Sequence, residues 1–255
     1  MHFDYTDKVK DMRQRLLAFM DEHIYPNEAR FFAEIAANRA AGNAWIPTKI
    51  IEELKPKARA AGLWNLFLPR SPRAPEGLSN LEYAPMCEIM GRVPFAAEVF
   101  NCSAPDTGNM ETLERYASEE IKDEWLEPLL RGEFRSAFLM TEPAVASSDA
   151  TNIQCEITRD GDHYVLNGQK TWSTRAIFAD WLFGLFRSDP TSSRHHGLSY
   201  LLVPLDTPGV TIRPIIALNG KQAFAEIFFD DVKVPVDNRI GEEGQGWHEI
   251  GRAHV

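Results

Sequence analysis

The chain has 255 residues, which is long enough to bury one large core or two modest ones. Its 27 Lys and Arg residues stand against 37 Asp and Glu residues, and the formal net charge of −10 argues against an extended nucleic-acid surface or an anionic membrane face. Cys87, Cys102 and Cys155 have no paired or CxxC spacing, so we predict reduced, buried thiols rather than a disulfide scaffold.

The beginning of the chain carries no predicted leader or membrane anchor. Its first stretch includes Asp4, Asp7, Lys8 and Lys10 and contains no apolar core of the kind that a signal peptide needs. No uninterrupted run of about 18 apolar residues follows in the sequence. We therefore expect a soluble, cytoplasmic protein without a membrane span.

Helical spacing dominates the first half of the chain. Residues 9–38 repeat apolar side chains at helical intervals with charges between them, which predicts one helix, or two helices joined near Pro26. Residues 46–61 repeat the pattern, with Pro47 suited to the start of a helix and Gly62 to its end.

Two further helices are predicted before the pattern changes. Ser79 and Glu82 have the spacing of a capping box at the start of residues 78–91. Residues 118–130 form the last amphipathic segment, and Gly132 is placed to end it.

After residue 134 the periodicity shifts toward two, the period of a strand. Six short segments bounded by Gly, Pro, Asp and Ser are predicted strands: residues 153–159, 163–166, 181–187, 198–203, 210–213 and 225–229. Strands at this spacing suggest a barrel or a sandwich. We predict an α+β fold with a helical N-terminal domain at 1–135, a β-barrel middle domain at 136–240 and the truncated start of a C-terminal helical domain at 241–255.

Residues 138–149 lie where the two patterns meet. Apolar residues able to form a strand run into Thr141, Glu142 and Pro143, and then into Ala144, Ala146, Ser147, Ser148 and Asp149. A proline stops a strand, and small residues let backbone amides approach a ligand closely. This segment is therefore predicted to be a polar ligand-binding loop.

Residues 163–174 carry a second signal. Asn167 and Gly168 predict a hairpin turn between residues 164–166 and 170–172, so that Trp172 and Thr174 share one face of the returning strand. An aromatic ring beside a hydroxyl suits a flat, hydrogen-bonding cofactor. Taken alone, the two residues are better explained as a buried core Trp and a strand-forming Thr.

Three motifs follow one another across residues 141–174. They are Thr-Glu-Pro at 141–143, Ser-Ser-Asp at 147–149 and Asn-Gly-Gln-Lys-x-Trp-x-Thr at 167–174. Together they resemble the acyl-CoA dehydrogenases, the FAD enzymes that desaturate acyl-CoA thioesters. The resemblance extends to residues 101–111 and 229–235, and within the family it is greatest to the branch that contains the vertebrate family members 10 and 11.

The resemblance implies a flavin site made by these motifs. The residues that match the family's cofactor-binding positions are Phe138, Met140, Thr141, Ser147, Ser148, Trp172 and Thr174. Phe138, Met140 and Thr141 would line the isoalloxazine ring. Trp172 would cover the ring, and Thr174 would reach its N5 and O4 side. Ser148, with Ser147 as its near-equivalent, would hold the flavin phosphate and the CoA arm of the substrate.

The resemblance also implies the reaction, an α,β-desaturation of an acyl-CoA thioester with hydride transfer to FAD, as in fatty acid β-oxidation. An electron-transfer flavoprotein would accept the electrons, and the full-length protein would be a homodimer or homotetramer. The family's catalytic base lies in the C-terminal helical bundle, so we expect no catalytic residue here. Glu142, in a predicted polar loop, is not expected to be the base. We expect this fragment to retain flavin weakly and to turn over little or no substrate.

Two alternatives remain open. The same fold serves acyl-CoA oxidases and flavin-dependent monooxygenases, in which reduced flavin meets oxygen. A non-catalytic module that binds acyl-CoA or FAD would also keep these motifs. A metal site is not expected, because His195 and His196 have no Cys, Asp or His at ligand spacing.

The last residues of the chain have two distinct features. Residues 241–247 contain G-x-x-G-x-G, the reverse of the dinucleotide-binding fingerprint, and they open no βαβ unit, so a Rossmann role is not expected. Residues 249–255 can be back-translated as GAG ATC GGA AGA GCA CAC GTC, which resembles a sequencing adapter. We expect that this tail is absent from the native protein.

Overall fold

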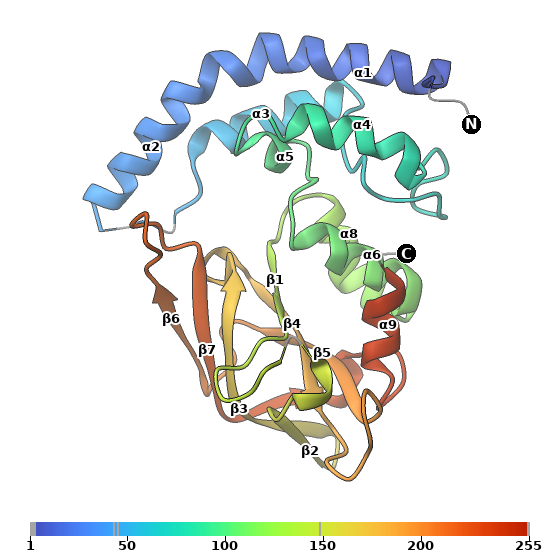
Figure 1. Ribbon diagram of the computed structural model, residues 1–255, viewed down its shortest axis with the longest axis vertical. Helices are drawn as coiled ribbons and strands as arrows, with labels where there is room; N and C mark the ends of the chain where they lie inside the picture. Colours follow the sequence, from blue (N-terminus) through green and yellow to red (C-terminus); the bar gives the residue numbers. More distant parts are fainter. Residues whose placement is uncertain (1–3, 43, 45, 148, 254–255) are drawn as a thin grey trace. The chain divides into compact units, whose positions relative to one another are not determined.

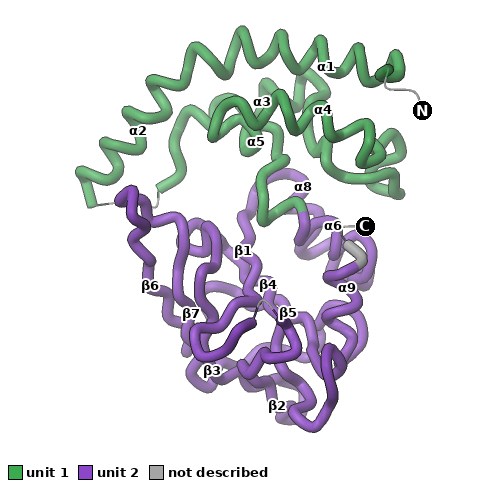
Figure 2. The backbone as a smooth tube through the Cα atoms, in the orientation of Figure 1, with its two compact units in different colours: residues 1–107 green, residues 108–255 purple. Residues whose placement is uncertain are grey.

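The computed structural model describes residues 4–42, 44, 46–147 and 149–253, and the side chains of all of these except residues 252 and 253. The chain forms two compact units, Met1–Thr107 and Gly108–Val255 (Figure 2). The predicted fold class, a helical part followed by a sheet, is confirmed. The domain boundary near residue 135 stays a prediction.

The first unit is helical. Its helices are α1 (Asp7–Phe19), α2 (Glu28–Ala40), α3 (Lys49–Ala60), α4 (Asn80–Met90) and α5 (Ala96–Val99) (Figure 1). A π turn, Met20–Ile24, and a 3-10 turn, Tyr25–Asn27, join α1 to α2. These turns confirm the predicted junction near Pro26. Proline has no N–H, so inside a regular helix it would remove a hydrogen bond.

The helix ends follow the sequence signals. Ser79 Oγ accepts a hydrogen bond from the Glu82 N–H at 3.3 Å, and the Ser79 N–H donates to Glu82 Oε2 at 2.9 Å, which confirms the capping box. Gly62 follows α3 with φ +65°, a left-handed conformation that glycine adopts without a Cβ penalty. One face of α1 and its continuation is buried, including Leu16, Met20 and Ile24.

The second unit combines helices with one sheet. Its helices are α6 (Asp106–Tyr116), which starts at the end of the first unit, α7 (Glu119–Ile121), α8 (Glu127–Leu130) and α9 (Gly246–Ala253). A π turn, Lys122–Leu126, joins α7 to α8, so residues 118–130 form the predicted helical segment. The expectation that residues 249–255 are foreign stays a prediction, to be checked by amplifying the locus from source DNA.

Within the described part of the chain, the sheet of the second unit has eight strands. They are β1 (Ser136–Leu139), β2 (Glu156–Asp160), β3 (His163–Thr174), β4 (Trp181–Arg187), β5 (Leu198–Pro204), β6 (Val210–Ile215), β7 (Phe224–Pro235) and β8 (Arg239–Ile240) (Figure 1). The order is β6-β7-β3-β2-β4-β5-β8, and β1 pairs with β4. Because β1 and β2 run parallel to β4 while the other pairs are antiparallel, the sheet is mixed.

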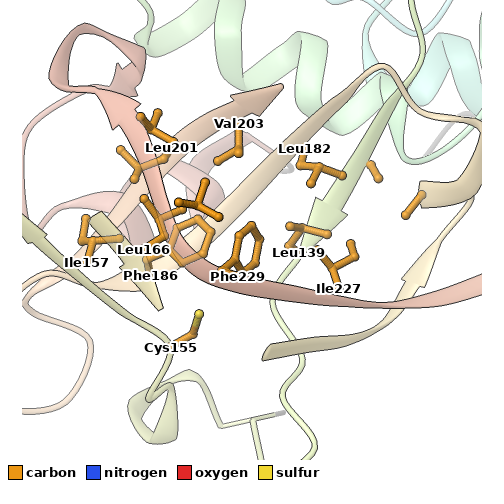
Figure 3. Packing of buried hydrophobic residues seen from close by; sticks show 14 of the residues in the cluster. Leu139, Cys155, Ile157, Leu166, Leu182, Phe186, Leu201, Val203, Ile227 and Phe229 are labelled. Atoms are coloured by element: carbon orange, nitrogen blue, oxygen red, sulfur yellow. The ribbon is translucent and has the colours of Figure 1, made fainter. Parts of the chain in front are cut away.

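The sheet curls around one apolar cluster (Figure 3). The rings of Phe186 on β4 and Phe229 on β7 lie 5.4 Å apart, edge to face. Two strands, β3 and β2, separate β7 from β4 in the sheet order, so a flat sheet would hold them roughly 14 Å apart. The strong curvature agrees with the barrel-like middle domain that the sequence predicted.

The predicted hairpin at Asn167 and Gly168 is wrong. β3 runs straight through both residues and pairs with β7 along its whole length, with a register shift between Leu166 and Gly168. The chain turns at Gly161 instead, between β2 and β3, where φ is +64°. At Gly168 a Cβ would lie 2.7 Å from Cys155 Sγ, so glycine is needed there for close packing and not for a turn.

Replacing Gly168 by alanine tests this interpretation. We expect Gly168→Ala to lower the free energy of unfolding by about 2 kcal/mol, because the new methyl group overpacks against Cys155 at a positive φ. Gly161→Ala is the control: nothing lies within 4 Å of its Cβ, so it pays only a conformational cost of about 1 kcal/mol. Urea denaturation measures both variants, and equal losses would contradict the packing argument.

Among the described residues, no helix combines the length and apolar character needed to cross a membrane.

Candidate functional site

The two motif segments lie side by side in the second unit. The Thr171 N–H on β3 donates to the Thr141 carbonyl at 2.8 Å, so the chain leaving β1 runs along the C-terminal part of β3. The structure thus brings Met140 and Thr141 next to the strand that carries Trp172 and Thr174.

Trp172 is the most conspicuous side chain of this surface. It remains 55% exposed, and its φ of +57° is a left-handed conformation that costs a non-glycine residue about 1 to 3 kcal/mol. The strain falls at a register shift between Lys170 and Ser173. The core-Trp interpretation is therefore wrong: this backbone presents the indole to solvent, and its ring meets the Phe224 ring edge to face at 5.9 Å between centroids.

The predicted alternation around Trp172 is confirmed. Trp172 and Thr174 are exposed, while Ser173 between them is buried. The Thr174 hydroxyl forms no hydrogen bond with any described residue, and the same holds for the N–H and the hydroxyl of Thr141. An exposed ring is thus accompanied by polar groups that are available to a ligand.

The other predicted cofactor-binding residues occupy varied environments. Phe138 and Met140 are half-buried, and the Phe138 ring meets the Tyr200 ring at 6.2 Å. Ser147 is buried, and its hydroxyl oxygen accepts the Glu142 N–H at 2.7 Å, so it closes the loop from within. Ser148 lies outside the described residues.

Asp149 ends the loop as a turn residue. Its Oδ1 accepts hydrogen bonds from the N–H and the hydroxyl of Thr151, at 3.0 Å and 2.7 Å, and these lower the pKa of the carboxyl. The bonds start a 3-10 turn, Ala150–Asn152. Asp149 therefore shapes the loop, as an Asx turn does.

Sequence reasoning missed a buried ion pair behind the loop. Lys170 Nζ on β3 lies 2.7 Å from Glu142 Oε1 and donates to the Met140 carbonyl at 3.2 Å, and both side chains are almost completely buried. Glu142 is therefore not in an exposed polar loop. Burial lowers the pKa of Lys170, since it disfavours the charged amine. No local residue pattern predicts this pair, because a register shift follows Lys170 and interrupts the alternation of buried and exposed side chains along β3.

Arg187 is a second buried cation that sequence reasoning missed. Its guanidinium donates to the carbonyls of Ile153 at 3.1 Å, Thr151 at 2.9 Å and His196 at 3.0 Å. Burial also lowers the pKa of Arg187. Lys170 on β3 thus holds the Thr-Glu-Pro motif itself, and Arg187 on β4 holds the backbone that follows it at Thr151 and Ile153.

Within the described ranges, no three His, Cys, Asp or Glu side chains gather as a metal site. The His195 ring instead stacks on Trp247, with 4.4 Å between centroids and 11° between planes.

Comparison with known proteins identifies the family. Residues 6–133 match the model of the acyl-CoA dehydrogenase N-terminal domain, and residues 137–232 match that of the acyl-CoA dehydrogenase middle domain. Because the two models account for most of the sequence, the chain belongs to the acyl-CoA dehydrogenase family.

Individual relatives agree with this assignment. FadE2 of Mycobacterium tuberculosis, named as an acyl-CoA dehydrogenase, is 47% identical over 254 residues, covering 97% of this chain and 61% of FadE2. Human acyl-CoA dehydrogenase family member 11 is 46% identical over 261 residues, covering 99% of this chain and 33% of the human protein. Mouse family member 10 is 44% identical, with 24% of its length covered. The predicted resemblance to members 10 and 11 is confirmed, and the chain spans only part of each relative.

A solved structure shares the fold closely. An acyl-CoA dehydrogenase homologue from Mycobacterium abscessus superposes with a TM-score of 0.90 at 41% identity, covering 99% of this chain and 66% of that protein. A structure described as PigA with FAD and proline has a TM-score of 0.80 at 25% identity, covering 99% of this chain and 63% of that one.

Proposed function

We propose that these two domains form the flavin-binding part of an acyl-CoA dehydrogenase that desaturates an acyl-CoA thioester. The observation that carries the proposal is the surface around Trp172. There an exposed indole on a strained backbone stands beside Thr141 and Thr174, whose hydroxyls have no partner among the described residues. This combination suits a flat ring with polar edges.

The residues present fit FAD. Trp172 would cover one face of the isoalloxazine ring, and Phe138 and Met140 would line its edge. The N–H and hydroxyl of Thr141 and the hydroxyl of Thr174 would donate to its polar rim. Bound FAD supplies hydride acceptance, and the protein supplies position and charge stabilisation. Ser147, already used inside the loop, would act on the phosphates only indirectly, and Ser148 keeps its predicted role at the flavin phosphate and the CoA arm.

The remaining parts of the proposal follow from family membership. The catalytic base would come from a C-terminal helical domain, beyond the two matched domains, and we do not propose Glu142 for that role because its carboxylate is buried against Lys170. An acyl-CoA would be the substrate, an electron-transfer flavoprotein the acceptor, and a homo-oligomer the working form, in fatty acid oxidation. One structural neighbour is described as an electron transferring flavoprotein of Acidaminococcus fermentans, which agrees with flavin chemistry on this fold.

Expression of the complete reading frame tests the proposal. The genomic sequence past codon 248 defines that frame. We expect a yellow protein with stoichiometric FAD that reduces ferrocenium or an electron-transfer flavoprotein when an acyl-CoA is added. The 255-residue chain is expected to retain flavin weakly and to show little or no turnover. A colourless full-length product without acceptor reduction would contradict the proposal and favour a non-catalytic binding module.

A same-fold oxidase or monooxygenase is the second candidate. The neighbour described with FAD and proline has a TM-score of 0.80, so this fold is also found in a protein described with FAD and a ligand other than an acyl-CoA. Photoreduction of the full-length protein followed by exposure to oxygen separates the two. A dehydrogenase is expected to reoxidise slowly without product, whereas an oxidase or monooxygenase reacts rapidly.

A further inference from the structure

The Glu142–Lys170 ion pair lies directly behind the proposed flavin surface. Lys170 precedes Trp172 by two positions on β3, and Glu142 is the neighbour of Thr141. Removing two charges from water is costly, and a well-packed apolar pair of similar volume is often equally or more stable. Stability alone is therefore a weak reason for a buried pair at this position.

The contacts of the pair point to a mechanical role. Lys170 Nζ binds both Glu142 Oε1 and the Met140 carbonyl, so it holds the residues on either side of Thr141. Because these contacts come from β3 itself, they set the distance between the Thr141 segment and the strand that carries Trp172.

The carboxylate of Glu142 extends the same connection further along the chain. Its Oε2 accepts the Gln154 N–H at 2.8 Å, and its Oε1 accepts the Cys155 N–H at 3.0 Å. The Glu142 N–H in turn donates to Ser147 Oγ at 2.7 Å. Both ends of the loop that contains residues 143–149 are thus attached to one ion pair, which no apolar replacement could do.

We propose that Glu142 and Lys170 are positioning residues that hold the Thr141 segment at the correct distance from Trp172, and thereby set the affinity for the flavin. The inference rests on the proposed function for its ligand. Its physical basis is independent of that function: directional hydrogen bonds fix a backbone more precisely than apolar contacts do.

The test uses Lys170→Met, Glu142→Gln and the double variant in the full-length protein. We expect each single variant to weaken FAD binding by roughly ten- to a hundredfold, the loss typical when residues that orient ligand contacts are removed. The double variant should lose about as much as one single variant, since the two residues act as a unit. The dissociation constant is measured by flavin fluorescence, and the position of the flavin absorbance band is recorded with it.

Lys55→Met is the matched control. Lys55 is also buried, lies in the first unit and pairs with Glu52 and Glu98. The Lys55→Met substitution should lower the melting temperature and leave the FAD dissociation constant and the flavin spectrum unchanged. If Lys170→Met and Glu142→Gln behave in the same way as Lys55→Met, the pair is merely structural and the inference is wrong.

Amide hydrogen exchange provides a readout without flavin. In flavin-free protein we expect the Thr171, Gln154 and Cys155 amides to exchange at least tenfold faster in Glu142→Gln than in the parent, at matched global stability. Unchanged exchange overturns the inference even if the parent binds no FAD. If the parent binds no FAD and these amides still exchange faster in Glu142→Gln, the result contradicts only the proposed function and not the inference about the ion pair. Should Lys170→Met not fold, Glu142→Gln and the charge-free double variant decide the question by both readouts.

Discussion

Trp172→Gly is expected to lower FAD affinity by roughly ten- to a hundredfold while the free energy of unfolding stays within about 1 kcal/mol of the parent. Stacking of a flat ring on an aromatic side chain contributes about 1 to 3 kcal/mol, and glycine removes all of it. Stability is nearly unaffected because two effects offset each other. Glycine relieves the strain of φ +57°, while the edge contact with Phe224, worth about 1 kcal/mol, is lost.

The measurement pairs flavin titration with urea denaturation of the full-length protein. Arg194→Gly is the matched control, because Arg194 is exposed and has a similar φ of +56° but no predicted flavin contact. It should gain a little stability and bind FAD like the parent. A Trp172→Gly variant that binds FAD normally would show that the exposed indole does not cover the flavin.

Arg187→Met is expected to lower the free energy of unfolding by about 3 kcal/mol. The guanidinium donates hydrogen bonds to three backbone carbonyls, those of Thr151, Ile153 and His196. Methionine keeps most of the volume but donates no hydrogen bond, so these carbonyls lose their charged donor, at a cost of about 1 to 3 kcal/mol for each group that water cannot reach. The two flanking loops, residues 150–153 and 188–197, should loosen together.

Arg159→Met on β2 is the control for this prediction. Arg159 is exposed, and among the described residues its side chain donates one hydrogen bond, to the Gly161 carbonyl at 3.2 Å, so its replacement should change stability by less than about 0.5 kcal/mol. Thermal and urea denaturation compare the two variants. If Arg187→Met costs no more than Arg159→Met, the guanidinium does not hold the loops.

Local signals in the sequence predicted most helices and strands correctly. The capping box of Ser79 and Glu82 and the strand at 181–187 depend on residues that are close in sequence, so their physics is readable from the chain. The hairpin at Asn167 and Gly168 failed for the opposite reason. The residue that explains Gly168 is Cys155, which packs against it from β2's side of the sheet and is distant in sequence.

The candidate site was likewise predicted only in part from the sequence. The motifs at 141–149 and 167–174 identified the family and the residues expected at the flavin, and their parity placed Trp172 and Thr174 on one face, which the structure shows to be exposed. Sequence alone could not show that Trp172 has a left-handed backbone, because the register shift beside it depends on pairing with β7. Nor could it show that the loop is closed by Ser147.

The amino-acid sequence by itself determined the family and the order of helical and β parts, and it predicted the side chains expected at a cofactor, because those depend on short motifs and on periodicity. Only the tertiary structure decided which charges are buried. Glu142 and Lys170 are 28 positions apart and meet because β1 and β3 bring them together. Arg187 reaches carbonyls up to 36 positions away in the same manner. Burial and pairing of charges depend on long-range packing, and no local pattern encodes that.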